Sequence, residues 1–174
     1  MTEVNHIGIT VGDLEAAVTL YKSVFDLEVL AEPQVATLGT HAGDRRRDVF
    51  GPRWGGMRIA HLATKDGGIG IELFEFVQPA TVAPEVDFEY WRCGVSHFCF
   101  TVDDLEDSID RLISFGGRKR SQIHTVWPGT RICYCEDPWG VVLELSSRDY
   151  HHIAGARQEA MVRSRVDIAT KGKR

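Results

Sequence analysis

The chain has 174 residues, 43% of them hydrophobic, and this length suits one ordinary domain or two small fused units. Its formal net charge of -5 argues against a nucleic acid or an anionic membrane as a partner, because both need concentrated Lys and Arg. No stretch approaches the length of a membrane span, and residues 1–5 lack the features of a secretory signal. We therefore expect a cytoplasmic protein.

The first half of the chain predicts a strand, a helix and three more strands. Residues 4–11 alternate as a strand, Asp13 is a suitable N-cap, and apolar residues recur at helical spacing from Leu14 to Phe25. The later strands are predicted at about 28–38, 57–64 and 68–77. Residues 39–56 are rich in Gly and charge, and they predict a loop.

The second half predicts the same series of elements. A strand at about 94–102 precedes Asp104, the N-cap of a helix that Gly116 and Gly117 end. The strands that follow are predicted at about 119–126, 130–136 and 140–147. Residues 137–140 predict the turn between the last two strands, and a polar tail follows with a helix near 153–165.

These two series are copies of one repeat. His6–Glu15 aligns without a gap on His97–Glu106, and Gly68–Leu73 aligns on Gly140–Leu145 in the same order. The repeat predicts an α+β fold of two βαβββ modules, whose strands form a cupped, mostly antiparallel mixed sheet with the helices on its outer face. The boundaries are 1–78 for the first module, 79–92 for the linker, 93–147 for the second module and 148–174 for the tail.

Strand alternation then selects four side chains, one His and one Glu from each module. In each module the helix must cover the more apolar face of its strands, so the intervening residues point to the face that no helix covers. The residues selected in this way are His6, Glu72, His97 and Glu144. A carboxylate flanked by apolar residues is costly to bury unpaired, and a divalent cation removes that cost for both Glu side chains. Mixed nitrogen and oxygen ligands favour one Zn, Ni, Co, Mn or Fe ion.

Other candidate ligands are less favoured by the same pattern. Glu75 has the opposite strand parity to Glu72 and no counterpart in the second module. Four further histidines have no repeat partner, and we interpret them as structural or surface residues: His61, His124, His151 and His152.

The cysteines predict neither a disulfide framework nor a CxxC metal site. Cys133 and Cys135 fall on one face of a predicted strand, and Cys93 and Cys99 are the other two. In a reducing cytosol we expect all four to be buried free thiols.

The sequence resembles the vicinal oxygen chelate superfamily, which includes glyoxalase I, extradiol dioxygenases, and fosfomycin and bleomycin resistance proteins. The resemblance covers residues 3–147 and rests on four segments: Asn5–Glu15, Ile71–Glu75, Gly94–Val102 and Asp137–Leu145. It implies paired βαβββ modules and a metal ion that chelates neighbouring oxygen atoms of a small-molecule substrate.

The resemblance leaves three functions open. In glyoxalase I and many epimerases four positions bind metal, and these match His6, Glu72, His97 and Glu144. This arrangement implies a lyase or isomerase that moves a proton next to a carbonyl, with Glu144 as ligand and base and Glu72 as the second choice. In extradiol dioxygenases the Glu72 position is not a ligand. A metal-free drug-binding resistance protein is the third alternative.

The substrate is less well indicated. The Arg and Asn with which glyoxalase I holds glutathione have no match here, since Thr10 lies on the first strand and Leu-Phe-Glu-Phe follows Glu72. Phe74, Phe76 and Trp54 predict either an apolar ligand site or core packing. The basic run that ends at Arg47 predicts either a solvated loop or a lid over an acidic substrate. Unpaired strand edges lead us to expect a homodimer.

Overall fold

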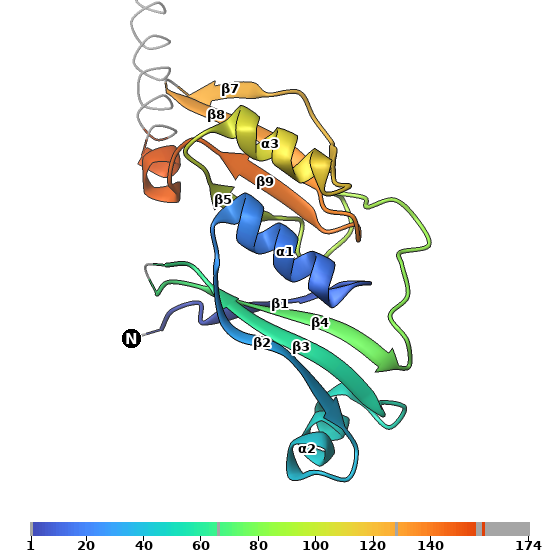
Figure 1. Cartoon of the computed structure of the whole chain (residues 1–174). Coiled ribbons are helices and arrows are strands. Elements are labelled where there is room, and N and C mark those ends of the chain that lie inside the picture. Colours follow the sequence, from blue (N-terminus) through green and yellow to red (C-terminus); the bar gives the residue numbers. More distant parts are fainter. Residues whose placement is uncertain (1, 66, 128, 156–157, 159–174) are drawn as a thin grey trace, which may run out of the picture. The chain divides into compact units, whose positions relative to one another are not determined.

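The computed structural model describes residues 2–65, 67–127, 129–155 and 158, and Figure 1 shows their helices and strands. The chain divides into two compact units, Met1–Glu89 with Pro138–Val141, and Tyr90–Asp137 with the chain from Val142 onward. Each unit contains one mixed sheet against which a helix packs. The predicted α+β class, with one βαβββ arrangement for each copy of the repeat, is confirmed.

The sheet of the first unit has four strands in the order β1-β4-β3-β2. Their bounds are His6–Thr10 for β1, Glu28–Thr37 for β2, Gly56–Ala63 for β3 and Gly70–Gln78 for β4. β1 pairs with β4 in parallel, whereas the other neighbours are antiparallel. Since β1 and β4 are adjacent, residues from the two ends of the module meet on one face of the sheet.

Helix α1, Leu14–Phe25, covers one face of this sheet. Asp13 is its N-cap as predicted, because the Asp13 side chain accepts a hydrogen bond of 2.9 Å from the backbone N–H of Ala16. The apolar stripe of the helix is buried, and it consists of Leu14, Ala17, Leu20, Tyr21 and Val24. From β4, Ile71 and Leu73 are buried toward the same side, so Glu72 between them belongs to the other face.

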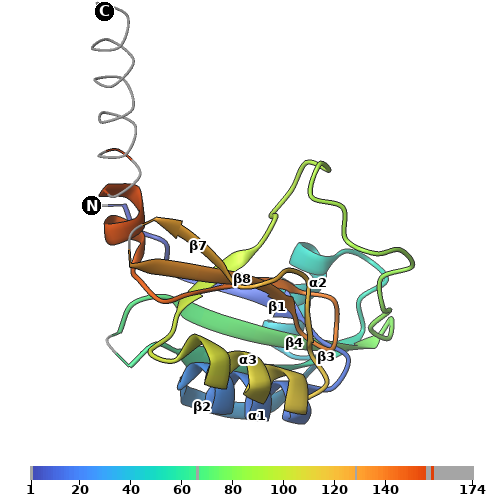
Figure 2. The same cartoon turned by 90° about the horizontal axis from the view of Figure 1, so that it is seen from above.

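The prediction of a loop at 39–56 is wrong, because His41–Phe50 forms helix α2. Thr40 caps it by accepting a hydrogen bond of 2.9 Å from the N–H of Gly43. The Phe50 ring packs edge-to-face on Phe74 and Phe76, with ring centroids 6.1 and 5.3 Å apart. α2 therefore lies on the opposite side of β3 and β4 from α1 (Figure 2). Half of its residues are charged and most are exposed, so the sequence shows no apolar stripe for this helix. A cap and the ring contacts of Phe50 stabilise it.

The second unit repeats the strand order of the first, as β5-β9-β8-β6 with β7 also paired to β8. Its elements are β5 (Phe98–Thr101), α3 (Leu105–Ser114), β6 (Arg118–Lys119), β7 (His124–Trp127), β8 (Thr130–Glu136) and β9 (Val142–Ser146). β5 pairs with β9 in parallel, as β1 does with β4. The Asp104 side chain caps α3 by accepting a 3.0 Å hydrogen bond from the N–H of Asp107.

The strand predicted at 119–126 is divided into β6 and β7. The N–H groups of Arg120 and Ser121 both donate to the carbonyl oxygen of Tyr134, at 2.8 and 3.1 Å. Two successive donors on one acceptor make a bulge, which bends the chain and interrupts the ladder. A bulge adds one residue to one strand, and residues 119–126 contain no Gly or Pro that would predict this interruption.

Three further expectations concern the remaining chain. Of the predicted helix near 153–165, only residues 153–155 and 158 lie within the described ranges, and there they are helical. In the part of the chain that the structure describes, no helix is long and apolar enough to cross a membrane. All four cysteines are free thiols, but only Cys133 and Cys135 are buried; Cys93 and Cys99 are exposed, so their predicted burial is wrong.

Candidate metal-binding site

In the first unit, His6 and Glu72 lie side by side at the β1–β4 pairing. His6 begins β1, and its Nε2 lies 3.5 Å from Oε2 of Glu72 on β4. The other ring nitrogen, Nδ1, lies 2.8 Å from Oδ1 of Asn5. Because Oδ1 is an acceptor, Nδ1 donates in this contact, which orients the ring so that Nε2 faces the carboxylate. A second ring nitrogen held in this way is typical of histidines that bind metal ions.

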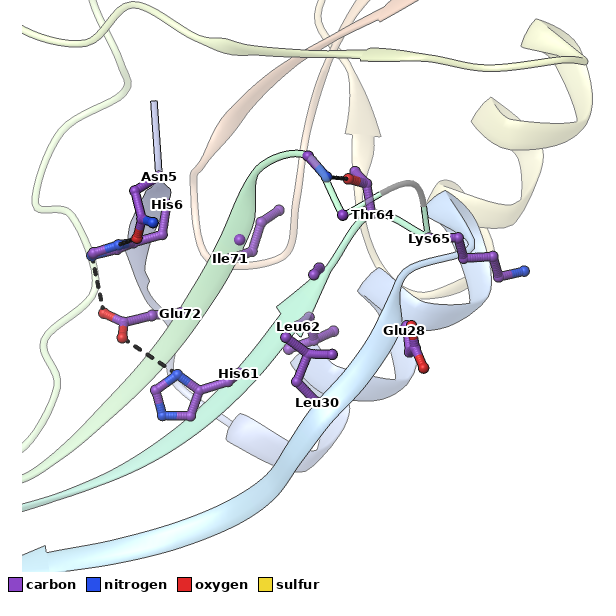
Figure 3. Close-up of a pocket in the computed structure, with 14 residues that line it drawn as sticks. Asn5, His6, Glu28, Leu30, His61, Leu62, Thr64, Lys65, Ile71 and Glu72 are labelled. Atoms are coloured by element: carbon purple, nitrogen blue, oxygen red, sulfur yellow. Dashed lines mark hydrogen bonds and ion pairs between the residues drawn. The ribbon is translucent and has the colours of Figure 1, made fainter. Parts of the chain in front are cut away.

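A second histidine contacts the same carboxylate. His61 lies directly across from Glu72 in the β3–β4 register, and its Nδ1 is 3.3 Å from Oε1 of Glu72. Figure 3 shows Glu72 between the His6 and His61 rings. All three side chains line a cavity of about 380 Å³ at the start of β4. The expectation that His61 has only a structural or surface role did not anticipate this contact.

The second unit contains the equivalent pair. Nε2 of His97, immediately before β5, lies 3.0 Å from Oε2 of Glu144 on β9. Nδ1 of His97 lies 2.9 Å from Oγ of Ser96. The Tyr134 hydroxyl, across from Glu144 in the β8–β9 register, donates a hydrogen bond of 3.3 Å to Oε2 of Glu144. Glu144 is less exposed than Glu72, with 14% against 27% of its side chain accessible.

Tyr134 remains a hydrogen-bond donor over the whole physiological pH range. Burial, and then the negative charge of Glu144, raise the pKa of the Tyr134 hydroxyl to about 12. Its ring packs edge-on against His97 and Tyr90, with centroids 5.2 and 5.9 Å away. These contacts hold the hydroxyl beside Glu144.

Sequence reasoning missed four residues that contact the predicted ligands: Asn5, His61, Ser96 and Tyr134. Asn5 and Ser96 could have been found, because each is the residue before the repeated His. His61 and Tyr134 differ in residue type, so the repeat does not align them. Their equivalence depends on which residues face each other across two strands.

Glu75 forms its hydrogen bonds on the face of the sheet that α1 covers. Its Oε2 accepts a hydrogen bond of 2.9 Å from Nη1 of Arg58 and another of 3.2 Å from the N–H of Leu14, the first residue of α1. Arg58 also pairs with Glu15 on the first turn of α1. Glu75 therefore fastens the N-terminus of α1 to the sheet, and it points away from Glu72.

Three of the four predicted substrate contacts belong to one apolar cluster. Phe74 and Phe76 share the face of Glu72 and pack, partly buried, against a cluster of Ala36, Trp54, Met57 and Ile59, in which Trp54 is only 2% exposed. Burial leaves Trp54 no surface for contact with a ligand. Arg47 lies in the last turn of α2 with an exposed side chain, and it is not among the residues that line the cavity of Figure 3.

The chemistry of the two pairs fits a divalent cation. Each unit supplies an imidazole nitrogen 3.0 to 3.5 Å from a carboxylate oxygen, with the second ring nitrogen held by the preceding residue. Across the described ranges, no three or more His, Cys, Asp or Glu side chains are gathered closely enough to hold a metal ion. A His/Glu pair alone does not complete a coordination shell, since structural and catalytic sites use at least three protein ligands.

Comparison with known families identifies the class of protein. The profile of the Glyoxalase/Bleomycin resistance protein/Dioxygenase superfamily matches residues 3–145, and the chain belongs to this superfamily. The comparison with curated proteins gives no match.

Solved structures share the fold. A glyoxalase family protein from Bacillus cereus superposes with a TM-score of 0.71 at 23% identity, covering 84% of this chain and 93% of that one. Glyoxalase I from Zea mays gives a TM-score of 0.56 at 21% identity, covering 84% of this chain and 44% of the maize protein. A fosfomycin resistance protein from Listeria monocytogenes, solved with Mn(II) and sulfate, gives 0.56 at 13% identity, covering 87% and 96%. At these identities the likeness concerns the fold alone.

Proposed function

We propose that the protein is a metal-dependent lyase or isomerase that moves a proton next to a carbonyl group of a small substrate with two neighbouring oxygen atoms. The observation that carries this proposal is the repeated His/Glu pair, which lies within 3.5 Å in the first unit and 3.0 Å in the second. Superfamily membership supports it, because the superfamily includes glyoxalases. The cavity beside Glu72, about 380 Å³, is of a size for a small molecule.

His6, Glu72, His97 and Glu144 are the residues that would hold one divalent ion, with Zn, Ni, Co, Mn and Fe as the candidates. When bound, the ion would polarise the substrate carbonyl and stabilise the negative charge that develops on its oxygen. Asn5 and Ser96 support this role, since each orients the ring of the following His through Nδ1.

Glu144 is the residue to which we assign the general base. Its Oε2 contacts both His97 and Tyr134, while no described residue of the second unit forms a hydrogen bond with its Oε1. A carboxylate that is fixed by contacts to one oxygen can accept a proton from the substrate on its other oxygen. Glu72 contacts an imidazole through each of its oxygens, so it has less freedom to exchange a proton.

Metal analysis of Glu→Gln variants tests the proposal. We expect wild-type protein to contain one divalent ion per chain, and Glu72→Gln and Glu144→Gln to lose it, because an amide is a weak metal ligand. Glu75→Gln is the matched control on the same strand, and it should keep the metal. Urea denaturation should, however, show a free energy of unfolding lower by about 1 kcal/mol, since the contacts of residue 75 with Arg58 and Leu14 weaken.

Two results would contradict this scheme. Full metal content in both the Glu72 and the Glu144 variants would rule out the four-residue site. Retention by Glu72→Gln alone, together with oxygen uptake, would instead favour a ring-cleavage dioxygenase with three protein ligands.

A further inference from the structure

The structure assigns to His61 and Tyr134 a common role: they are positioning residues, one in each unit, that orient the carboxylates of Glu72 and Glu144 for metal binding. This inference rests on the proposed function and names the residues that prepare its site. It does not follow from the repeat in the sequence, because the two residue types differ.

The topology makes the two positions equivalent. In each unit the Glu lies on the strand in the second place of the sheet, β4 or β9, between the first strand of the module and β3 or β8. His61 on β3 faces Glu72 on β4, and Tyr134 on β8 faces Glu144 on β9. Residues directly opposite on antiparallel strands have Cβ atoms about 5 Å apart, which suits a hydrogen bond between side chains. Each carboxylate thus lies between a His from one neighbouring strand and a second polar ring from the other.

In the first unit, each oxygen of the Glu72 carboxylate contacts a different imidazole ring. His6 contacts Oε2 of Glu72 at 3.5 Å, and His61 contacts Oε1 at 3.3 Å. A carboxylate contacted at both oxygens has a defined rotation about its last bond. His61 therefore limits the positions that Glu72 can take when the metal arrives, and this lowers the entropic cost of ordering the ligand.

In the second unit, both contacts fall on one oxygen. Tyr134 donates to Oε2 of Glu144 at 3.3 Å, and Nε2 of His97 lies 3.0 Å from the same atom. The Tyr134 hydroxyl is the donor of this hydrogen bond, because an ionised carboxylate oxygen can only accept. This difference between the units predicts different consequences. Loss of His61 should lower metal affinity, whereas loss of Tyr134 should lower metal affinity and also displace Oε1 of Glu144, the oxygen to which we assign the base.

The test uses variants that keep the ring and remove its polar atoms. In full-length protein we would measure the Kd for Zn(II) by chelator competition, the visible spectrum of the Co(II) form, and the melting temperature of the metal-free form. We expect His61→Phe and Tyr134→Phe to raise the Kd about 10- to 100-fold, as the loss of a partner behind a ligand does elsewhere, with little change in melting temperature. His61→Gln retains a polar group that can reach the carboxylate, and it should recover most of the affinity.

Matched controls are available in the same chain. His124 on β7 and Tyr150 are exposed, and neither contacts a predicted ligand, so His124→Phe and Tyr150→Phe should bind Zn(II) with wild-type affinity. Wild-type Kd values and Co(II) spectra in both His61→Phe and Tyr134→Phe would overturn the inference. Glu72→Gln and Glu144→Gln, measured in parallel, separate the two failures: if these lose the metal while the ring variants keep it, only the positioning role is wrong. If they also bind normally, the proposed site fails and the inference with it.

Discussion

Glu72 and Glu75 are separated by two residues on β4, yet their surroundings have nothing in common. Glu75 receives hydrogen bonds from Arg58 and from the first N–H of α1, whereas Glu72 lies between two imidazoles on the other face. Strand alternation alone places them apart, because an odd spacing puts two side chains on opposite faces of a sheet. This part of the candidate site could be predicted from the sequence.

The cysteines show where residue-level prediction failed. Cys133 and Cys135 are on one face of β8 and fully buried, in accord with the pattern, but Cys93 and Cys99 are exposed. Residue type gives an average burial for a free thiol. The actual exposure depends on the segments that cover each position, which no local pattern contains.

Burial of Cys135 leads to a prediction about pH. Burial, together with the neighbouring Cys133 thiol, raises the pKa of Cys135 to about 12 from an ordinary value of 9.0. Below pH 9 the thiol is protonated in both the folded and the unfolded chain. As the pH rises from about 9 toward 12, only the unfolded chain loses the proton, so the free energy of unfolding decreases. Urea unfolding at about pH 8 and about pH 10 should show a larger loss in wild type than in Cys135→Ala, and equal losses would contradict the assignment.

Among the helices and strands, α2 is the largest difference between the predicted and the observed structure. Half of its residues are charged, and its last turn packs through Phe50 on the aromatic face of β4. A short helix of this kind has little amphipathic pattern, so its Gly and charged residues indicated a loop. The packing partners Phe74 and Phe76 lie more than twenty residues further along the chain, and only the folded sheet places them under the helix.

The cap of α2 gives a prediction at this scale. Thr40 accepts the N–H of Gly43 at 2.9 Å, and this satisfies one of the free donors at the start of the helix. Thr40→Ala should lower the free energy of unfolding by about 1 kcal/mol, and Thr40→Ser should lower it much less. Urea denaturation measures both, and proteolysis at residues 39–56 should accelerate only in the Ala variant. If Thr40→Ala is as stable as wild type, the cap does not stabilise α2.

For the whole molecule, the central question is whether the two His/Glu pairs serve one ion or two. A His/Glu pair alone falls short of the three or four protein ligands that hold Zn(II) and related ions, so the proposed function predicts one ion for both pairs. The double variants His6→Ala/Glu72→Gln and His97→Ala/Glu144→Gln should therefore each abolish binding, and wild type should bind one equivalent in isothermal titration calorimetry. Two equivalents in wild type, with one remaining in each double variant, would contradict a shared ion.

The sequence by itself determined the repeat, the class of the fold and the face to which each candidate ligand points. These features are local, since side-chain alternation, capping residues and turn residues act over a few positions along the chain. Only the tertiary structure decided that His61 and Tyr134 lie beside Glu72 and Glu144, that α2 covers Phe74 and Phe76, and that β6 and β7 are separate. Register between strands and packing across a sheet depend on how distant segments meet, and a one-residue shift would exchange the faces of every side chain.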